Sequence, residues 1–401
     1  MQPVTHFCLV HDPVVANVTP ILDSRFRPEE VILLVCPDRR EQASWLENVL
    51  RSMNVKIKYC EISDAWDVVH IRTCVKEYLA SLSDNVEIAL NVTGGTKPMT
   101  VAAYEAFRDA RQPIFYVHHE RDHLVWMYPH NIPSEDLFDK IKLPEFLMVN
   151  GAELIGTVDR NPIEGQWRAL TAELIRGIEK YAAPLSVLNK LASQAEKILR
   201  VKFDEHEYKK KHYPSDLLQR IKQLIELFSM HKLLRQDYGE LFFTSEKTRF
   251  YVNGGWLEEH VFGLLHKIKP ELEAMQKINP EENLIQDFGR NLTIVKKNNG
   301  APVKNELDVA FLSDNKLHII ECKTKRFDFN DGPDSHGADV LYKLDTLRDH
   351  IGGLQANAML VSYKPLKQEH LWRAKELGIE VCASKDIQNL HQLLTKWIRR
   401  S

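Results

Sequence analysis

Residues Glu306–Lys325 read ELDVAFLSDNKLHIIECKTK, and this stretch decides the fold of the C-terminal part of the chain. Two runs of β-branched and apolar residues within it, Leu307–Leu312 and Leu317–Cys322, have the length of strands. Polar residues separate the two runs, and Asp314 and Asn315 tolerate the positive φ angles of a two-residue loop. The stretch therefore predicts a β-hairpin.

The register of this hairpin brings charged side chains together at its open end. It places Asp308 opposite Glu321, with Cβ atoms roughly 4.5–5.5 Å apart, and Glu306 opposite Lys323. Because side chains alternate along a strand, Glu321 and Lys323 share a face. Opposed carboxylates destabilise a hairpin unless a cation neutralises them, and Mg²⁺ prefers oxygen ligands. The alternative is a solvated hairpin end with an ion pair between Glu306 and Lys323.

The neighbours of Glu321 favour the metal site over that alternative. Ile319, Ile320 and Cys322 are apolar, which indicates a strand that is buried on both faces. A carboxylate in such a strand needs a partner, because an unpaired buried charge is costly.

The combination of Asp308 with Glu321, Cys322 and Lys323 resembles the D…(D/E)xK signature of the PD-(D/E)xK nuclease superfamily. Leu307 stands where that family often has proline, a position at which the family varies. The resemblance implies that Asp308 and Glu321 bind Mg²⁺ or Mn²⁺, with the Cys322 carbonyl as a third protein ligand. It also implies that Lys323 assists the attacking water.

Nucleases of this superfamily also carry a helical glutamate ahead of the central hairpin. A helix is predicted for Trp256–Lys269, and Glu258 lies nearer its apolar face than Glu259 does. Glu258 is therefore the candidate that faces the site, and the alternative is a solvated carboxylate at the helix flank. Beyond the hairpin, the turn-rich segment Phe327–Ala338 is a candidate substrate gate, and Lys343 is a candidate phosphate contact.

Length and composition limit the architecture. The 401 residues favour two or three domains, and 44% hydrophobic and 27% charged residues are typical of globular proteins. A formal net charge of −3 excludes a global basic surface for nucleic acids. The 6 cysteines form no CxxC pair, which favours reduced thiols in a cytoplasmic protein. No apolar run approaches the ~18 residues that span a membrane, so no membrane association is expected.

Strand and helix patterns alternate from residue 1 to about 145. The expected strands are Phe7–Val10, Val31–Cys36, Val55–Tyr59, Val86–Asn91 and Ile114–Val117. The expected helices are Arg40–Met53, Val68–Leu82 and Met99–Ala110. This alternation predicts a parallel sheet with helices on both faces, which binds ligands beyond the carboxyl ends of its strands.

A glycine-containing loop, TGGTK, follows the expected strand Val86–Asn91. Gly94 and Gly95 let the backbone approach a ligand closely, and Pro98 suits the first turn of a helix. Free N–H groups at that helix start, together with Lys97, make an anion site. The loop lacks the Walker A pattern, and the alternative is a tight strand-to-helix turn with a solvated lysine.

At this position in a Rossmann-like domain, TGGTK resembles the ligand loop of CRISPR-associated Rossmann-fold (CARF) domains. Those domains sense cyclic oligoadenylates made by type III CRISPR complexes. The resemblance implies ligand contacts from the loop itself: Thr93, Gly94, Gly95, Thr96 and Lys97. It also implies contacts from the first loop of the domain: His11, Asp12, Asn17 and Thr19.

The stretch from 146 to 250 is expected to be a connector. Helices are predicted for Glu164–Tyr181 and Leu185–Leu199, with Pro184 between them. Leu241–Thr244 and Thr248–Val252 are expected to form a hairpin. Helices followed by a small hairpin indicate a winged-helix-like module.

The expected fold class is α/β. It comprises a Rossmann-like CARF domain (1–145), a helical or winged-helix-like connector (146–250) and a PD-(D/E)xK restriction-endonuclease-like domain (251–401). This order resembles the single-CARF CRISPR ancillary nucleases that cyclic tetra-adenylate activates, and implies a metal-dependent endonuclease acting on DNA and/or RNA. A ring with two-fold symmetry needs two TGGTK loops, so a C₂ homodimer is expected. The alternatives are a non-catalytic, cyclic-oligoadenylate-responsive DNA-binding regulator and a ligand-independent restriction- or repair-type nuclease.

Overall fold

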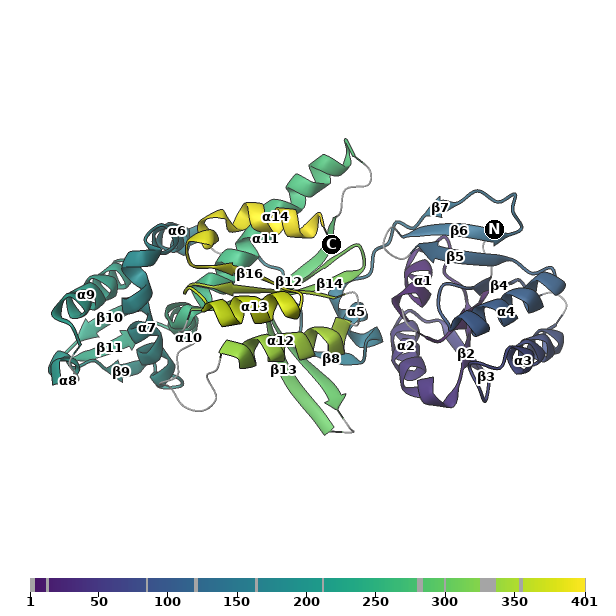
Figure 1. Ribbon diagram of the computed structural model, residues 1–401, viewed down its shortest axis with the longest axis horizontal. Helices are drawn as coiled ribbons and strands as arrows, with labels where there is room; N and C mark the ends of the chain where they lie inside the picture. The colour runs from purple at the N-terminus through teal and green to yellow at the C-terminus, as the bar shows by residue number, and fades with distance from the viewer. Residues whose placement is uncertain are drawn as a thin grey trace.

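Three sheets organise the protein. The computed structural model describes residues 4–11, 14–83, 86–118, 122–162, 165–210, 213–279, 284–298, 301–324, 337–352 and 356–400. Asp12 and most of the expected gate, Phe327–His336, lie outside these ranges. Figure 1 shows a seven-stranded sheet at one end, a six-stranded sheet in the middle and a three-stranded sheet at the other end.

The N-terminal sheet has the strand order β3-β2-β1-β4-β5-β6-β7. Its strands are β1 (Thr5–Leu9), β2 (Glu30–Val35), β3 (Lys56–Glu61), β4 (Ile88–Asn91), β5 (Ile114–His118), β6 (His123–Tyr128) and β7 (Glu135–Asp136). The first five are parallel, which confirms the five predicted strands. The antiparallel edge of β6 and β7 was not predicted, although the alternating burial of β6 is typical of a strand.

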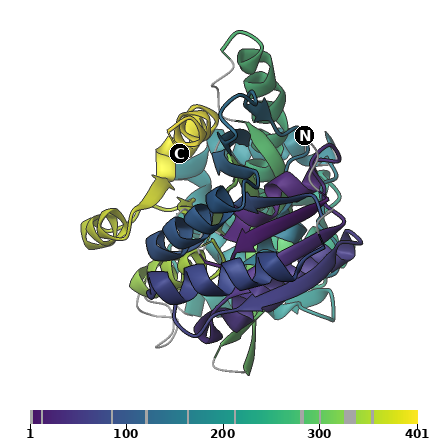
Figure 2. The same cartoon turned by 90° about the vertical axis from the view of Figure 1, so that its right-hand side faces the viewer.

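Helices cover both faces of this sheet, as predicted, and Figure 2 views the molecule from this end. They are α1 (Thr19–Leu22), α2 (Arg40–Ser52), α3 (Val68–Ser81) and α4 (Lys97–Asp109), with short 3₁₀ turns η1 (Val14–Asn17) and η2 (Pro37–Arg39). Leu46 of α2 packs with Leu33 on one face. Phe107 of α4 packs with Leu34 on the other face, because side chains alternate along β2.

The central sheet has the order β16-β15-β14-β13-β12-β8. Its strands are β8 (Ala152–Ile155), β12 (Ile285–Asn298), β13 (Ala301–Ser313), β14 (Lys316–Lys323), β15 (Asn357–Ser362) and β16 (Ile379–Ala383). Around it lie α11 (Trp256–Gln276), α12 (Gly337–Gly352), α13 (Gln368–Glu376), η6 (Ser384–Asn389) and α14 (Leu390–Ile398). Phe311 packs with α11 and α14, whereas Leu312 packs with α12 and α13, so helices again cover both faces.

One hydrophobic cluster runs from the N-terminal sheet into the central sheet. Helix α5 (Leu143–Val149) lies between the two sheets in Figure 1, and strand β8 follows it in the chain. Leu46 of α2, Phe146 of α5 and Ile294 of β12 belong to this cluster. Strand β8, from the expected connector, is therefore an edge strand of the central sheet.

A three-stranded sheet and several helices make up most of the predicted connector. The elements are η3 (Gly165–Trp167), α6 (Arg168–Arg176), α7 (Ile178–Gln194), β9 (Arg200–Lys202), α8 (Glu205–Lys210), α9 (Ser215–Met230), β10 (Leu234–Asp237), β11 (Glu240–Phe243) and α10 (Glu246–Phe250). The strand order is β10-β11-β9.

Two local predictions in the connector are wrong. Pro184 lies inside α7, and the break between α6 and α7 falls at Gly177. The hairpin is formed by β10 and β11, not by the two segments predicted for it. Tyr238 and Gly239 supply the positive φ angles of its loop, and a capping box at Ser245 starts a helix where the second strand was expected.

All six cysteines are unpaired, as predicted. In the described parts of the chain, no helix has the length and apolar character needed to cross a membrane.

Candidate functional site

The predicted hairpin of β13 and β14 is confirmed. Its antiparallel register runs from Ser313–Lys316 to Val309–Ile320. Asp314 and Asn315 have φ angles of 48° and 58°, so both loop residues adopt the left-handed conformation of a type I′ turn.

The residues next along this register are Asp308 and Glu321. The backbone N–H of Cys322 donates a hydrogen bond of 2.7 Å to Oδ2 of Asp308, which ties the carboxylate to β14. Lys323 forms an ion pair with Glu321. Glu306 lies opposite Thr293 on the β12 side of its strand and is largely exposed. The hairpin thus brings Asp308, Glu321 and Lys323 together.

Burial makes the charged forms of the side chains in this cluster unfavourable. The pKa of Asp308 is raised to about 7, first by burial and then by the charge of Glu321. The pKa of Glu258 is raised to about 9, again by burial first and then by Asp308. Burial opposes the charge of Lys323, but Glu321 and Asp308 outweigh it and raise the pKa of Lys323. The site therefore disfavours full ionisation of its carboxyl groups, and a bound cation would favour their charged forms.

Helix α11 turns Glu258 toward the acidic cluster. Glu258 interacts electrostatically with Asp308, Lys323 and Glu321. Its neighbour Glu259 lines a separate cavity of about 380 Å³, together with Trp167, Arg168, His260 and His266 among others. The structure thus places Glu258, and not Glu259, beside the predicted site.

A close backbone contact at the start of α11 fixes this helix against β14. The π-helical turn η4 (Tyr251–Gly255) precedes α11, and Gly254 has a φ of 117°. A Cβ at Gly254 would lie 2.1 Å from Oγ1 of Thr324, the residue after Lys323. Asn189 of α7 also hydrogen-bonds Thr324 at 2.9 Å. The sequence signal was the Gly254-Gly255 pair, which did not reveal its partner.

The oxygen donors at the hairpin end fit a hard divalent cation in an open site. Within the described ranges, no three side chains of His, Cys, Asp and Glu are grouped as a metal cage. Mg²⁺ does not need one, because it usually takes one or two carboxylates and completes its shell with water and phosphate. Asp308 and Glu321 would supply the carboxylates, and the resemblance adds the Cys322 carbonyl as a further donor.

The TGGTK loop packs directly onto the end of β1. A Cβ at Gly94 would lie 2.5 Å from the Leu9 carbonyl oxygen, and Gly95 has a φ of 87°. Thr96 caps α4 by accepting a hydrogen bond from the Met99 N–H at 3.2 Å. β1 and β4 are the strands between which the sheet reverses its order, the usual place for a ligand in such folds.

Buried hydrogen bonds hold the loop in place. The Thr93 hydroxyl donates to Oδ1 of Asn91 at 2.6 Å and accepts from the Val117 N–H at 2.7 Å. Nδ2 of Asn17 donates to the Leu9 carbonyl at 3.0 Å. Thr93 therefore links the loop to β5, and Asn17 links the first loop to β1.

Exposure separates the predicted ligand residues into two groups. Lys97 is exposed and His11 is half-buried, so both reach the surface. Asn17 and Thr19 are completely buried, and Thr96 is 7% exposed. The buried residues shape the loops, whereas the exposed ones are available to a ligand.

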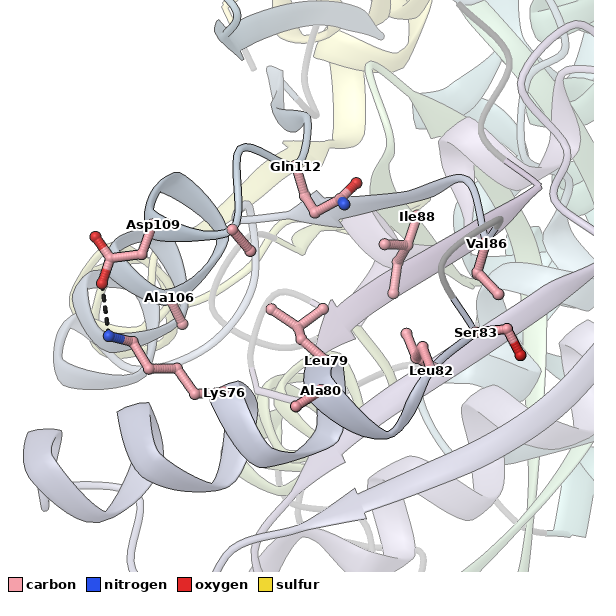
Figure 3. A pocket seen from close by; sticks show the side chains of 11 residues that line it. Lys76, Leu79, Ala80, Leu82, Ser83, Val86, Ile88, Ala106, Asp109 and Gln112 are labelled. Carbon is pink, nitrogen blue, oxygen red and sulfur yellow. Dashed lines mark hydrogen bonds and ion pairs between the residues drawn. The ribbon is translucent and has the colours of Figure 1, made fainter.

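The cavity between α3 and α4 lies away from this loop. It has a volume of about 400 Å³ and is lined at its mouth by an ion pair of Lys76 and Asp109 (Figure 3). Its wall includes Ile88, at the opposite end of β4 from the TGGTK loop. We assign it no part in the site.

Comparison with protein families identifies two regions of similarity. Residues 5–146 match the Card1 CARF domain, and residues 244–401 match the Card1-like endonuclease domain. The two regions leave out residues 147–243, which are most of the predicted connector. No curated protein sequence matches the chain.

Solved structures resemble the chain over nearly its whole length. Protein VC1899 from Vibrio cholerae is 30% identical, with a TM-score of 0.81 over 98% of this chain and 97% of that one. Can2 from Sulfobacillus thermosulfidooxidans, solved with cyclic tetra-adenylate, is 27% identical, with a TM-score of 0.74 over 98% and 99%. A type III CRISPR defence DNA nuclease activated by cyclic oligoadenylate shares the fold, at 17% identity and a TM-score of 0.51 over 90% of this chain and 45% of that one.

Proposed function

Because the chain belongs to the family that joins a Card1 CARF domain to a Card1-like endonuclease domain, we propose that it is a metal-dependent endonuclease of type III CRISPR defence, activated by cyclic tetra-adenylate. The observation that carries the proposal is the convergence of Asp308, Glu321 and Lys323 at one end of the β13–β14 hairpin. The similarity to Can2, which was solved with cyclic tetra-adenylate, supports the choice of activator.

The residues of the hairpin would hold Mg²⁺ or Mn²⁺ in the PD-(D/E)xK manner. Asp308, Glu321 and the Cys322 carbonyl would be the ligands, with Glu258 beside them. A bound ion of this kind supplies positive charge for the phosphate and lowers the pKa of a water molecule. Lys323 stays protonated because its pKa is raised by Glu321 and Asp308, so its ammonium can stabilise negative charge on the scissile phosphate.

The TGGTK loop would bind the activator. Lys97 is exposed at the start of α4, where its ammonium and the positive end of the helix suit a phosphate, and Thr93, Gly95 and His11 belong to the same two loops. Each chain has one such loop, so we propose that a C₂ homodimer encloses the two-fold ring. The six free cysteines favour a reducing compartment, and we propose a cytoplasmic location.

A cleavage assay tests the proposal. Labelled RNA, single-stranded DNA and supercoiled plasmid are incubated with Mn²⁺, with and without cyclic tetra-adenylate. We expect cleavage of at least one substrate that depends on both additions and is abolished in Glu321→Ala. Glu306→Ala is the matched control, because it removes an exposed carboxylate of the same hairpin and should cleave like the wild type.

The assay also separates the proposal from the two alternatives. Ligand-dependent gel shifts without product strands would favour a DNA-binding regulator. Equal cleavage with and without cyclic tetra-adenylate would favour a ligand-independent nuclease. Wild-type cleavage by Glu321→Ala would remove the metal site from the hairpin.

A further inference from the structure

The turn of the catalytic hairpin contacts the N-terminal domain. Nδ2 of Asn315 donates a hydrogen bond of 2.6 Å to Oδ1 of Asp122, across 193 residues of sequence. Asp122 is 2% exposed and Asn315 is 3% exposed. A buried, charge-assisted hydrogen bond between two domains is directional and is lost if the domains shift.

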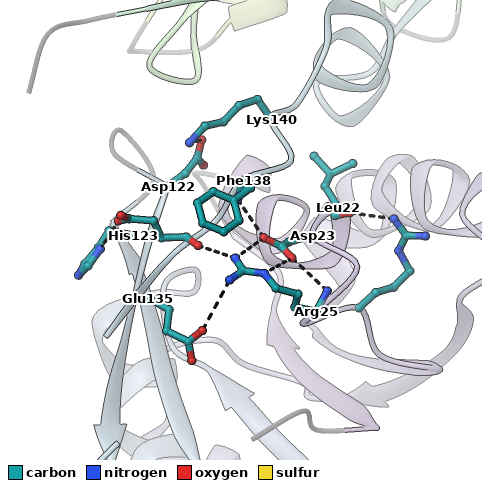
Figure 4. A network of polar contacts seen from close by, with 10 residues as sticks. Leu22, Asp23, Arg25, Asp122, His123, Glu135, Phe138 and Lys140 are labelled. Carbon is teal, nitrogen blue, oxygen red and sulfur yellow. Dashed lines mark hydrogen bonds and ion pairs between the residues drawn. The ribbon is translucent and has the colours of Figure 1, made fainter. Parts of the chain in front are cut away.

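Asp122 is fixed within the N-terminal domain. It has a φ of 48° and lies immediately before β6. Its Oδ2 pairs with Nζ of Lys140 at 2.8 Å, and its carbonyl accepts from the Leu137 N–H at 2.7 Å. Figure 4 shows Asp122 and Lys140 together, next to His123 and Phe138. The carboxylate that meets Asn315 is thus held by its own domain.

The same region is connected to the TGGTK loop through β5. The Val117 N–H of β5 donates to the Thr93 hydroxyl at 2.7 Å. The next residue, His118, pairs with His123 of β6, which follows Asp122. The loop is therefore linked to Asp122 through one hydrogen bond and the adjacent strands β5 and β6.

On the other side, Asn315 joins the hairpin to β12. Its N–H donates to Oε1 of Gln286 at 2.6 Å, and its Oδ1 accepts from Nε2 of Gln286 at 2.8 Å. On the two strands that leave this turn, Asp308 and Glu321 lie directly beyond Val309 and Ile320, the last residue pair of the β13–β14 ladder. The turn and the acidic cluster are therefore the two ends of one hairpin.

We propose that the Asp122–Asn315 contact positions the catalytic hairpin relative to the CARF domain and couples ligand binding to cleavage. Both are positioning residues, since neither belongs to the acidic cluster. The inference rests on the proposed function. Coupling requires that the contact differ in strength between the resting and the activated arrangement of the domains.

Three glycine variants test the contact. Asn315→Gly and Asp122→Gly each remove one partner, and glycine accepts the positive φ angle at both positions. Asn291→Gly is the matched control, because Asn291 is exposed in the same sheet with a φ of 51°. The readout is the activation ratio, defined as the cleavage rate at saturating cyclic tetra-adenylate divided by the rate without it.

We expect each contact variant to lower the activation ratio at least tenfold, and the double variant to lower it no further. Asp122→Asn keeps an oxygen acceptor for Asn315 and should retain most of the ratio. By reciprocity, a non-cleavable substrate should change the ligand Kd of the wild type but not that of the contact variants. Ligand binding itself, with melting curves, shows that the variants are folded.

Two kinds of result would overturn the inference. One is an activation ratio within twofold of the wild-type value in both Asn315→Gly and Asp122→Gly. The other is an additive loss in the double variant, or an equal loss in Asn291→Gly, which would indicate general destabilisation. A wild type that cleaves equally with and without the ligand would instead overturn the proposed function, and the coupling with it.

Discussion

At the scale of single residues, Lys97 is the cationic side chain of the TGGTK loop. It starts α4 and is exposed, where a phosphate would meet both its ammonium and the helix N-terminus. We expect Lys97→Ala to weaken binding of cyclic tetra-adenylate by about 10- to 100-fold, the usual loss for a hydrogen bond to a charged group. Titration calorimetry with the ligand measures this.

Lys76→Ala is the control for Lys97→Ala. Lys76 pairs with Asp109 on the paired helices α3 and α4, at the mouth of the cavity away from the loop (Figure 3). Its removal should leave the ligand Kd unchanged. Unchanged binding in Lys97→Ala as well would take the lysine out of the ligand site.

Because His6 is buried, we expect the N-terminal sheet to lose stability in acid. It is completely buried on β1, and burial lowers its pKa to about 3. In the unfolded chain a histidine has a pKa near ~6.5. The unfolded state therefore binds an extra proton below that pH, so stability is full above pH ~6.5 and falls as the pH drops toward 3.

At pH 5 the loss from His6 amounts to about 2 kcal/mol of unfolding free energy. We expect His6→Leu to reduce the difference in stability between pH 7 and pH 5 by this amount in urea titrations. His130→Leu removes an exposed histidine and should leave that difference as it is in the wild type. An unaltered pH dependence in His6→Leu would show that another group governs the acid response.

At the scale of elements, the orientation of α11 determines which of two adjacent glutamates lies beside the acidic cluster. Successive residues of a helix point about 100° apart, and here Glu258 faces Asp308 while Glu259 lines the cavity beside Trp167. We expect Glu258→Gln to lower the cleavage rate at least tenfold, because it replaces a carboxylate beside the proposed metal ligands. Glu259→Gln, measured in the same plasmid assay, should stay within threefold of the wild type.

The reverse order of effects would assign the site to Glu259. Equal losses in both variants, with lowered melting temperatures, would mean that both glutamates act through the packing of α11.

The elements that the sequence predicts well are those with local signals. The β13–β14 hairpin follows from its alternating strands and the Asp314-Asn315 turn, and its register places Asp308 without further information. Pro184 misled the prediction because a proline usually ends or kinks a helix, whereas here it lies buried inside α7. Propensity is a weak prior where tertiary packing decides.

The contacts that sequence reasoning missed are long-range. Nothing near Gly254 indicates that Thr324 packs against it, and nothing near Asn315 indicates that Asp122 accepts its hydrogen bond. The contact between the N-terminal and C-terminal domains depends on such long-range interactions. The order of the domains was predictable from the motifs, but the way in which they meet was not.

At the scale of the whole molecule, the central sheet depends on residues from outside the endonuclease match. Strand β8 pairs with β12 and lies before residue 244. Arg160 makes two hydrogen bonds of 2.7 Å to Asp287, and the Tyr363 hydroxyl donates to the Leu174 carbonyl at 2.7 Å. A fragment that begins at residue 244 would lose an edge strand and leave these buried polar groups without partners.

The N-terminal match is different, because two hydrophobic clusters of the N-terminal sheet lie wholly inside it. We therefore expect the fragment 5–146 to unfold cooperatively in urea and 244–401 not to. The fragment 141–401 restores β8, Arg160 and α6, and should regain cooperative unfolding and near-ultraviolet circular dichroism. Cooperative unfolding of 244–401 at the urea concentration of 141–401 would show that the central sheet is self-sufficient. The Asp122–Asn315 contact would then join two parts that fold independently. Its loss would lower the free energy of unfolding by less than is expected if the shared hydrophobic cluster makes the two parts unfold together.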